Sequence, residues 1–474
     1  MRDRPNVLVV VLDTARADHL PPHEPGNRLA PGLARLAEGG RALEIFRTTA
    51  PWTLPSHASL FCGAYPSEHG IHGRAGVRPD RRVASVRSAV QRQGELWLPE
   101  SLRRAGYRTW AVSANPWISE PMGLSFGFER FVPVGAARLR PRGTGKGTRE
   151  RASDGIPSAV RRPLGRATRH LLEWRRGIDA GGESGVEQAR GLMRDSGGPW
   201  FGFVNLMEAH VPYAPPRAHN ELGGLAGLRA PAAARKRRSY RNALSFNLGR
   251  DVFSPEELAT IQALYRGEIR YLDALVGRLL ADLPANTVLI VTADHGEALG
   301  EHHQVDHQMT VIEEVLRIPF LLLGGAEVPE GFASIRQLPE LLAGVAGLDP
   351  SPWRARQRVP PGVAVAQYES TVAHDRRSVG VAREGGFPPE KVALLESEMA
   401  AVVEGERKLV EVAGLRSLHS LPGEAVVHEP GTIDRLAAHL ESARSVRAPE
   451  PDEDALSDED AAGIEERLEQ LGYL

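Results

Sequence analysis

The sequence has very little cysteine: Cys62 is the only one among 474 residues. No disulfide can therefore form within the chain. Net charge is also nearly absent, because 58 Lys and Arg residues stand against 60 Asp and Glu residues and leave a balance of −2. So small a balance gives no overall electric field that would favour nucleic acid. We therefore expect no nucleic-acid partner.

Long hydrophobic runs are missing too. The first apolar run, Val7–Leu12, is too short for a signal peptide or a membrane span, and it ends on the charged residue Asp13. From this start we expect a cytoplasmic protein without a membrane partner. The chain also contains no internal repeat and no extended low-complexity tract.

The composition, with 42% apolar and 25% charged residues, is enough for a large core. The length fits two or three domains, or equally one large α/β domain with an appendage. Continuous apolar runs predict strands buried on both faces of a parallel sheet at Val7–Leu12, Thr109–Ser113, Phe201–Asn205, Val288–Thr292 and Pro319–Leu323. Helical patterns lie between them at Leu29–Gly39, Leu98–Gly106 and Pro255–Leu283. The alternation predicts an α/β fold: a mostly parallel, doubly wound sheet flanked by helices, with its site at the carboxyl ends of strands.

Three stretches interrupt this pattern. Residues 136–176 are rich in Arg, Gly, Ser and Pro, which predicts a solvated basic insertion; the alternative is a basic lid that attracts an anionic substrate. Gly223–Arg238 is predicted as a second loop. Residues 449–474 begin with an acidic stretch and predict a tether followed by a short helix, Ala461–Leu471.

Residues 350–448 predict a C-terminal subdomain, which leaves residues 1–349 as the catalytic domain. Short strands are expected in this subdomain at Val363–Gln367, Ser378–Ala382, Ala400–Val403 and Arg407–Val412. A helix is expected at Gly431–Arg447. No catalytic motif occurs in this part of the sequence, so the site should lie in residues 1–349.

One segment, Ala50–Gly63, resembles the signature of the sulfatases of the alkaline phosphatase superfamily. Further segments resemble the same family, in the family's order, at Pro5–Asp13, Trp200–Tyr213, Tyr265–Asp273 and Thr287–Glu297. The resemblance extends over most of the chain. It implies an alkaline phosphatase-like fold with a small antiparallel sheet and a helix near the C-terminus, where Glu406–Val410 resembles one of the strands.

The signature differs from that of a sulfatase at the residue that attacks the substrate. Sulfatases have Cys or Ser there and oxidise it to formylglycine, whereas this chain has Thr53. Since Thr cannot become formylglycine, the resemblance implies a plain hydroxyl nucleophile bound to a metal. Thr at this place is similar to the phosphodiesterases, nucleotide pyrophosphatases and lipoteichoic-acid synthases of the superfamily.

Asp13, Thr53, Asp294 and His295 match the places of the family's metal ligands. Two carboxylates, a hydroxyl and an imidazole suit one divalent cation; the imidazole favours Mn²⁺ or Zn²⁺ over Ca²⁺ or Mg²⁺. Taken singly, Asp13 could instead cap a helix and Thr53 could be an ordinary turn residue. Leu206 stands where a two-zinc phosphodiesterase needs Asp, so we expect one metal ion.

The resemblance also implies residues that contact the substrate. His210 matches the family's substrate-binding His and is a candidate proton donor to the leaving oxygen. His307 stands where many relatives have a Lys that contacts the anion and the leaving group. The neighbouring His302 and His303 stay open between a second metal site and a solvated loop.

Three more residues are candidates for substrate binding. Arg74 lies near a place where relatives have Asn, and its guanidinium could bind two oxygens of an anion; an ordinary surface Arg is equally plausible. Asn115 stands where sulfatases have a Lys within Gly-Lys-Trp-His, so a cation is missing. His57 replaces the signature's Arg, and it could brace the nucleophile as that Arg does.

Together these residues predict a metal-dependent hydrolase of a small anionic ester: a phosphate diester, a phosphonate monoester or a sulfate ester. A covalent intermediate on Thr53 is expected, with the phosphodiesterase type favoured over the sulfatase type. The alternative is a transferase that passes the phosphoryl or sulfuryl group from Thr53 to an alcohol. The pocket for the acceptor distinguishes these two classes.

Overall fold

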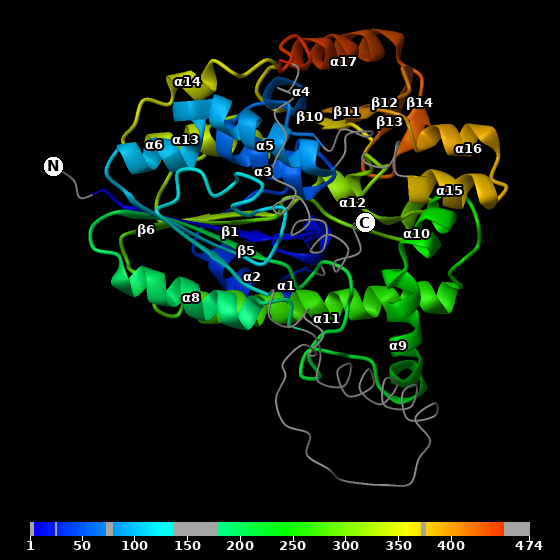
Figure 1. The fold of residues 1–474 in the computed structure, drawn as a ribbon, viewed down its shortest axis with the longest axis horizontal. Coiled ribbons are helices and arrows are strands. Elements are labelled where there is room, and N and C mark those ends of the chain that lie inside the picture. Colours follow the sequence, from blue (N-terminus) through cyan, green and yellow to red (C-terminus); the bar gives the residue numbers. More distant parts are fainter. Residues whose placement is uncertain (1–3, 24–25, 73–78, 136–178, 371–375, 450–474) are drawn as a thin grey trace, which may run out of the picture.

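The computed structural model describes residues 4–23, 26–72, 79–135, 179–370 and 376–449. Its largest element is a seven-stranded sheet with the strand order β2-β9-β6-β1-β5-β3-β4 (Figure 1). The strands are β1 (Asn6–Leu12), β2 (Arg41–Ala42), β3 (Arg108–Ser113), β4 (Arg130–Pro133), β5 (Trp200–Leu206), β6 (Thr287–Thr292) and β9 (Phe320–Leu323). The strands from β6 to β4 in this order pair in parallel, which confirms the predicted fold class.

Helices cover both faces of this sheet (Figure 1). On one face lie α1 (Gly26–Leu29), α2 (Pro31–Glu38), α8 (Gly182–Asp195) and α11 (Pro255–Leu280). On the other lie α3 (Thr53–Cys62), α4 (Pro66–His69), α5 (Pro79–Gln93), α6 (Leu98–Arg104), α13 (Leu338–Val345) and α14 (Ser351–Arg354). The long helix α11 begins with a capping box between Ser254 and Glu257, which satisfies backbone donors at its first turn.

The central strand β1 explains where the site lies. Its Val and Leu side chains are completely buried, as expected for a strand covered by helices on both faces. In the parallel register, Val11 is level with Asn205 of β5 and with Thr292 of β6. The residues that follow these positions therefore emerge together at the carboxyl edge of the sheet.

Two predicted features of this half of the chain are wrong. The segment Pro319–Leu323 is a buried strand, β9, but it runs antiparallel to β6 at the edge of the sheet. Gly223–Arg238 is not a loop but the helix α9 (Gly224–Arg238). Its many alanines have high helix propensity, and Ala230, Ala233 and Ala234 are buried.

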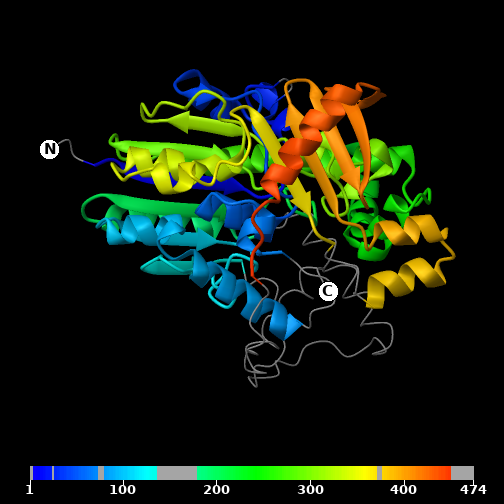
Figure 2. The same ribbon diagram turned by 90° about the horizontal axis from the view of Figure 1, so that it is seen from above.

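The C-terminal part forms a separate antiparallel sheet in the order β10-β11-β12-β13-β14 (Figure 2). Its elements are β10 (Val363–Tyr368), β11 (Met399–Glu404), β12 (Arg407–Val412), β13 (Leu415–Ser420), β14 (Ala425–Val427) and the covering helix α17 (Pro430–Ala443). Apolar side chains from the sheet and from α17 form a core of their own. This confirms the predicted C-terminal subdomain as part of the fold, whereas the division at residues 349 and 350 stays a prediction.

One predicted strand of this subdomain is wrong. Ser378–Ala382 belongs to the helix α15 (Arg376–Glu384), which is followed by α16 (Pro389–Leu394). Ala382 is buried against Leu244 and Leu248, next to α10 (Tyr240–Asn247), instead of pairing at the sheet edge. A short apolar run fits either a strand or a helix, and here packing against α10 decides for the helix.

Shorter elements complete the fold: the hairpin of β7 (Ala298–Leu299) and β8 (Val305–Asp306), and α12 (Glu313–Leu316). In the parts that the structure describes, no helix combines the length and apolar character that a membrane crossing requires. The basic insertion at residues 136–176 and the helix Ala461–Leu471 fall outside the described residues.

A buried charge network links the C-terminal sheet to α12 and to Arg47. Lys408 of β12 is fully buried, and its Nζ lies 2.6 Å from Glu424 Oε1 and 3.3 Å from Glu313 Oε1. Arg47 donates to the other oxygen of Glu313 at 2.8 Å. Glu313 lies at the start of α12, so the network ties the C-terminal sheet to α12.

We expect Lys408→Met to destabilise the protein by about 3–5 kcal/mol, because the carboxylates of Glu313 and Glu424 then lose a buried positive partner. Urea unfolding followed by circular dichroism measures the change. Lys391→Met on α16 is the matched control: Lys391 is exposed, so its replacement should change the free energy of unfolding by less than about 0.5 kcal/mol. Equal stabilities of the two variants would contradict the prediction.

Candidate active site

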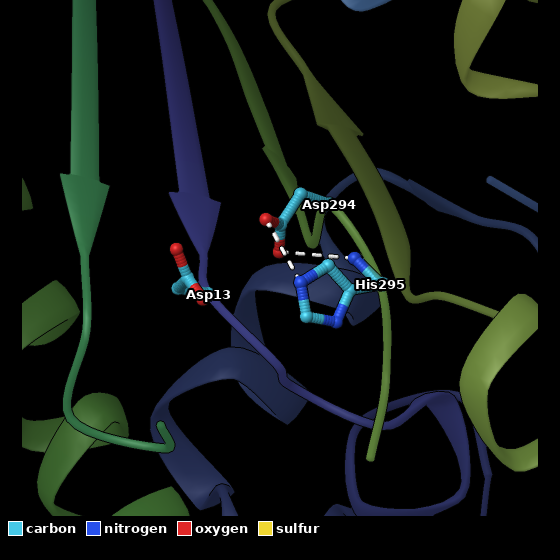
Figure 3. A group of neighbouring side chains, drawn as sticks. All are labelled: Asp13, Asp294 and His295. Carbon is cyan, nitrogen blue, oxygen red and sulfur yellow. Dashed lines mark hydrogen bonds and ion pairs between the residues drawn. The ribbon is translucent and has the colours of Figure 1, made fainter. Parts of the chain in front are cut away.

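Three predicted metal ligands meet at the carboxyl edge of the main sheet. Asp13 follows β1 and Asp294 follows β6, with His295 next to it (Figure 3). One ligand atom from each of these residues lies within 4.8 Å of the other two, and all three side chains are buried. The structure therefore brings these three predicted residues together at one place.

Asp13 presents one free oxygen. Its Oδ2 accepts hydrogen bonds from Asn115 Nδ2 at 2.7 Å and from Asn205 Nδ2 at 3.2 Å. Asn115 Oδ1 in turn accepts from the backbone N–H of Trp117, which fixes the amide with its nitrogen toward Asp13. Asp13 Oδ1 is buried and has no hydrogen-bond partner in the described structure.

Asp294 is arranged in the same way. Its Oδ1 accepts from the backbone N–H groups of His295 at 2.9 Å and Thr14 at 3.3 Å. Its Oδ2 is buried without a hydrogen-bond partner among the described residues and lies 3.4 Å from His295 Nε2. The carboxylates of Asp13 and Asp294 are thus each held by one oxygen and leave the other available.

His295 is held as a neutral imidazole. Its Nδ1–H donates to the carbonyl of Gly296 at 2.9 Å, which leaves the lone pair of Nε2 for the site. Burial and the positive charge of His307 lower the pKa of His295 to about 3. Gly296 has to be glycine, because a Cβ there would lie 2.0 Å from the carbonyl oxygen of Glu314.

These donor atoms fit a divalent cation. A buried carboxylate oxygen without a partner is unfavourable unless a proton or a cation occupies the space beside it. Asp13 and Asp294 each have such an oxygen, and His295 offers a neutral nitrogen. Mixed oxygen and nitrogen donors suit Mn²⁺ or Zn²⁺ better than Ca²⁺ or Mg²⁺.

Thr53 stands beside this cluster as the first residue of α3. Its Oγ1 lies 3.4 Å from His295 Nε2 and 3.4 Å from Asn115 Nδ2. No side chain caps this helix, whose N-terminal N–H groups and dipole favour an anion next to Thr53. The predicted fourth ligand is therefore adjacent to His295 and to Asn115, which also donates to Asp13.

His57 and Asn115 lie against the nucleophile and its neighbours. His57 Nδ1 is 2.9 Å from the carbonyl oxygen of Thr53 and 3.5 Å from Asp294 Oδ2, which places it to brace the start of α3. Asn115 links Asp13 to Thr53, as the hydrogen bonds above show. Arg74, the other residue predicted to bind substrate, lies outside the described residues.

His210 and His307 lie close to each other, and His307 lies beside His295. The centres of their rings are 5.6 Å apart, and the ring of His307 is 4.3 Å from that of His295. His210 Nδ1 donates to the carbonyl of Val211 at 2.9 Å. Burial acts to lower the pKa of His307, but the carboxylates of Asp306 and Glu297 more than offset this and raise it to about 9.

His302 and His303 do not join His307. The ring of His303 stacks on Phe246 at 4.0 Å between centres. His302 is 41% exposed at its side chain, and its Nε2 lies 3.8 Å from Glu314 Oε2. The three histidines therefore point to different partners, which speaks against a second metal site made from them.

Several residues of the site were not predicted. Asn205 is a buried polar residue inside the otherwise apolar strand β5, and this interruption of the apolar run is the signal that could have marked it. Ser56 donates to the backbone carbonyl of Asp294 at 2.6 Å, one helical turn after Thr53. Arg237, Glu297 and Asp306 surround His307, and no local motif marks them as a group.

The α/β sheet, the buried carboxylate and imidazole cluster and the adjacent hydroxyl define an ester hydrolase that works with a metal ion. The sulfatase family model matches residues 5–338. The chain belongs to the sulfatase family, which is metal-dependent and part of the alkaline phosphatase superfamily. It is an enzyme of the sulfatase type.

Individual relatives are distant. The multifunctional alkaline phosphatase superfamily protein PehA of Trinickia caryophylli is 24% identical over 411 residues, which cover 75% of this chain and 77% of that protein. An arylsulfatase of Clostridium perfringens is 23% identical over 361 residues, covering 69% and 70%. The structure is similar to the phosphonate monoester hydrolase of Agrobacterium radiobacter, with a TM-score of 0.60 at 17% identity over 93% of this chain and 96% of that one.

Proposed function

We propose that this protein hydrolyses phosphate diesters or phosphonate monoesters in preference to sulfate esters, through a covalent intermediate on Thr53. One observation carries the proposal: the Thr53 hydroxyl, at the start of α3, lies 3.4 Å from Nε2 of His295, which belongs to the carboxylate and imidazole cluster. Sulfatases use formylglycine at this place, and Thr cannot be converted to it. One of the two relatives is a multifunctional alkaline phosphatase superfamily protein and the other is an arylsulfatase, so they do not point to one substrate. The choice of substrate in this proposal therefore rests on Thr53.

The residues divide the reaction among them. Asp13, Asp294 and His295 would hold a divalent cation, which makes a nearby hydroxyl more acidic and offsets negative charge on the ester. Thr53 Oγ1 attacks phosphorus, its hydroxyl proton passes to water, and the bond from phosphorus to the leaving oxygen breaks. His307 or His210 contacts that oxygen and supplies its proton. Water then cleaves the Thr53 ester and regenerates the hydroxyl.

The charges around Thr53 suit a monoanion. His307 carries a positive charge at neutral pH, since its pKa is raised to about 9 by Asp306 and Glu297 against the effect of burial. The positive charge of Arg237 is already paired with Glu297, with 2.6 Å between Nη2 and Oε1. Asn115 is neutral where sulfatases have a Lys. A diester or a phosphonate monoester has one negative charge and matches this limited positive charge better than a phosphate monoester dianion does.

We expect kcat/KM to be highest for bis(4-nitrophenyl) phosphate or 4-nitrophenyl phenylphosphonate when four 4-nitrophenyl esters, including the phosphate monoester and the sulfate, are compared with Mn²⁺ present. All four release the same leaving group, so the comparison reports on the group that Thr53 attacks. Sulfate hydrolysis faster than diester hydrolysis by about 100-fold or more would contradict the phosphoryl assignment. Repeating the assay with added glycerol distinguishes transfer from hydrolysis, because a transferase would form the glycerol ester in place of the free acid.

A further inference from the structure

Four charged side chains form a closed ring behind His307. His307 Nδ1 lies 3.2 Å from Glu297 Oε2 and 3.2 Å from Asp306 Oδ1. Arg237 Nη2 donates to the other oxygen of Glu297 at 2.6 Å, and Arg237 Nη1 lies 3.6 Å from the other oxygen of Asp306. Each carboxylate therefore uses one oxygen for His307 and the other for Arg237.

The members of this ring come from separate segments. Arg237 belongs to α9, Glu297 follows the Asp294–Gly296 motif, and Asp306 ends β8. Arg237 is 2% exposed and Glu297 is 0% exposed. At this depth two carboxylates need matching positive charge, and Arg237 together with His307 provides it. The guanidinium fork of Arg237 suits the task because it can bind both carboxylates at once.

The backbone that carries His307 is held in an unusual conformation. Asp306 has φ of +83°, which is rare for a residue with a side chain. Such conformations persist where the surroundings determine them and are common at functional sites. Here Asn247 at the end of α10 pairs with Val305 through both its side-chain atoms, at 2.8 Å each. The segment α9–α10 thus holds the strand end that presents His307.

The ring also fixes which atom of His307 faces the substrate. With Nδ1 bound by Glu297 and Asp306, the remaining hydrogen-bonding atom is Nε2, which is buried and has no partner among the described residues. We propose that Arg237 is a positioning residue that fixes the ring of His307, through Glu297 and Asp306, so that Nε2 contacts the ester attacked by Thr53. The inference rests on the proposed function, in which His307 contacts the substrate.

A second cation is the competing occupant of the ring. Ligand atoms of Glu297, Asp306 and His307 lie within 4.8 Å of one another, as the atoms of a metal site would. Arg237 already supplies the positive charge at this place. We therefore expect about one metal ion per chain and none in the ring. Two tightly bound ions, with the second lost in Asp306→Asn, would overturn the proposal.

A double-mutant cycle tests the positioning role, with Arg237→Lys and His307→Ala assayed on 4-nitrophenyl phenylphosphonate. Lys keeps the charge but lacks the fork that spans two carboxylates. We expect His307→Ala to lower kcat/KM by about 100- to 1,000-fold. Arg237→Lys should lower it by about 10- to 100-fold. In the His307→Ala background, Arg237→Lys should change it by less than about threefold, because the residue through which it acts is gone.

The outcomes separate the proposal from its rivals. Equal losses from Arg237→Lys in both backgrounds, or no loss in the wild-type background, would overturn it. Asp306→Asn undergoes the same cycle and replaces Arg237→Lys if circular dichroism shows that variant to be misfolded. Arg235→Lys, on the exposed side of α9, is the control and should match wild type. An active Thr53→Ala enzyme would instead refute the proposed function itself, whatever the cycle shows.

Discussion

Replacing Thr53 by alanine is expected to lower kcat/KM by a factor on the order of 10⁴–10⁶, because the variant loses the atom that attacks the ester. The fold should remain, since the described hydrogen bonds of the Thr53 side chain are long ones, to His295 and Asn115 at 3.4 Å. Turnover of 4-nitrophenyl phenylphosphonate measures the effect. Metal content should stay at about one ion per chain, since two carboxylates and an imidazole remain.

Thr53→Ser is the matched control. It keeps the hydroxyl and removes only a methyl group, so it should retain most of the activity that Thr53→Ala loses. Acid quenching during turnover, followed by mass spectrometry of the peptide, should show the phosphonyl group on residue 53 in wild type and in Thr53→Ser. Activity close to wild type in Thr53→Ala would exclude Thr53 as the nucleophile.

The main sheet was predictable because its strands are marked locally. Val7–Leu12 and Val288–Thr292 are uninterrupted apolar runs, and such runs have few alternatives in an α/β protein. The prediction of a loop at Gly223–Arg238 was wrong. Its frequent Gly and Arg suggest a loop, whereas its alanines favour a helix once they are buried against the rest of the protein. The prediction of a strand at Ser378–Ala382 was wrong because a short apolar run fits a strand as well as the helix that packs on α10.

The residues of the site also differ in whether a local sequence signal marks them. Asp13, Thr53 and Asp294–His295 could be found because each lies where a strand ends or a helix begins, inside a recognisable motif. Arg237 could not, because it is 60 residues from Glu297 and sits in a segment that looks like a loop. Residues that hold other residues in place depend on long-range packing, which a single sequence does not display.

The second large effect is expected on metal binding. Asp294→Ala removes the free Oδ2 and also the Oδ1 that accepts from the backbone of His295 and Thr14. We expect metal affinity to fall by more than about 100-fold, beyond the 10- to 100-fold typical of residues that only support a ligand. Mn²⁺ titration and elemental analysis after dialysis measure it without relying on activity.

Two further variants sharpen this comparison. Asn205→Leu keeps every proposed ligand but removes one hydrogen bond to Asp13 Oδ2, so its affinity should fall by about 10- to 100-fold, between wild type and Asp294→Ala. Asp282→Ala removes a partly exposed carboxylate that pairs with Arg190 and should bind metal like wild type. Metal affinity is therefore expected to be highest in Asp282→Ala, intermediate in Asn205→Leu and lowest in Asp294→Ala. Full metal content in Asp294→Ala would show that the cation binds elsewhere, because Asp294 supplies one of the two carboxylates of the proposed site.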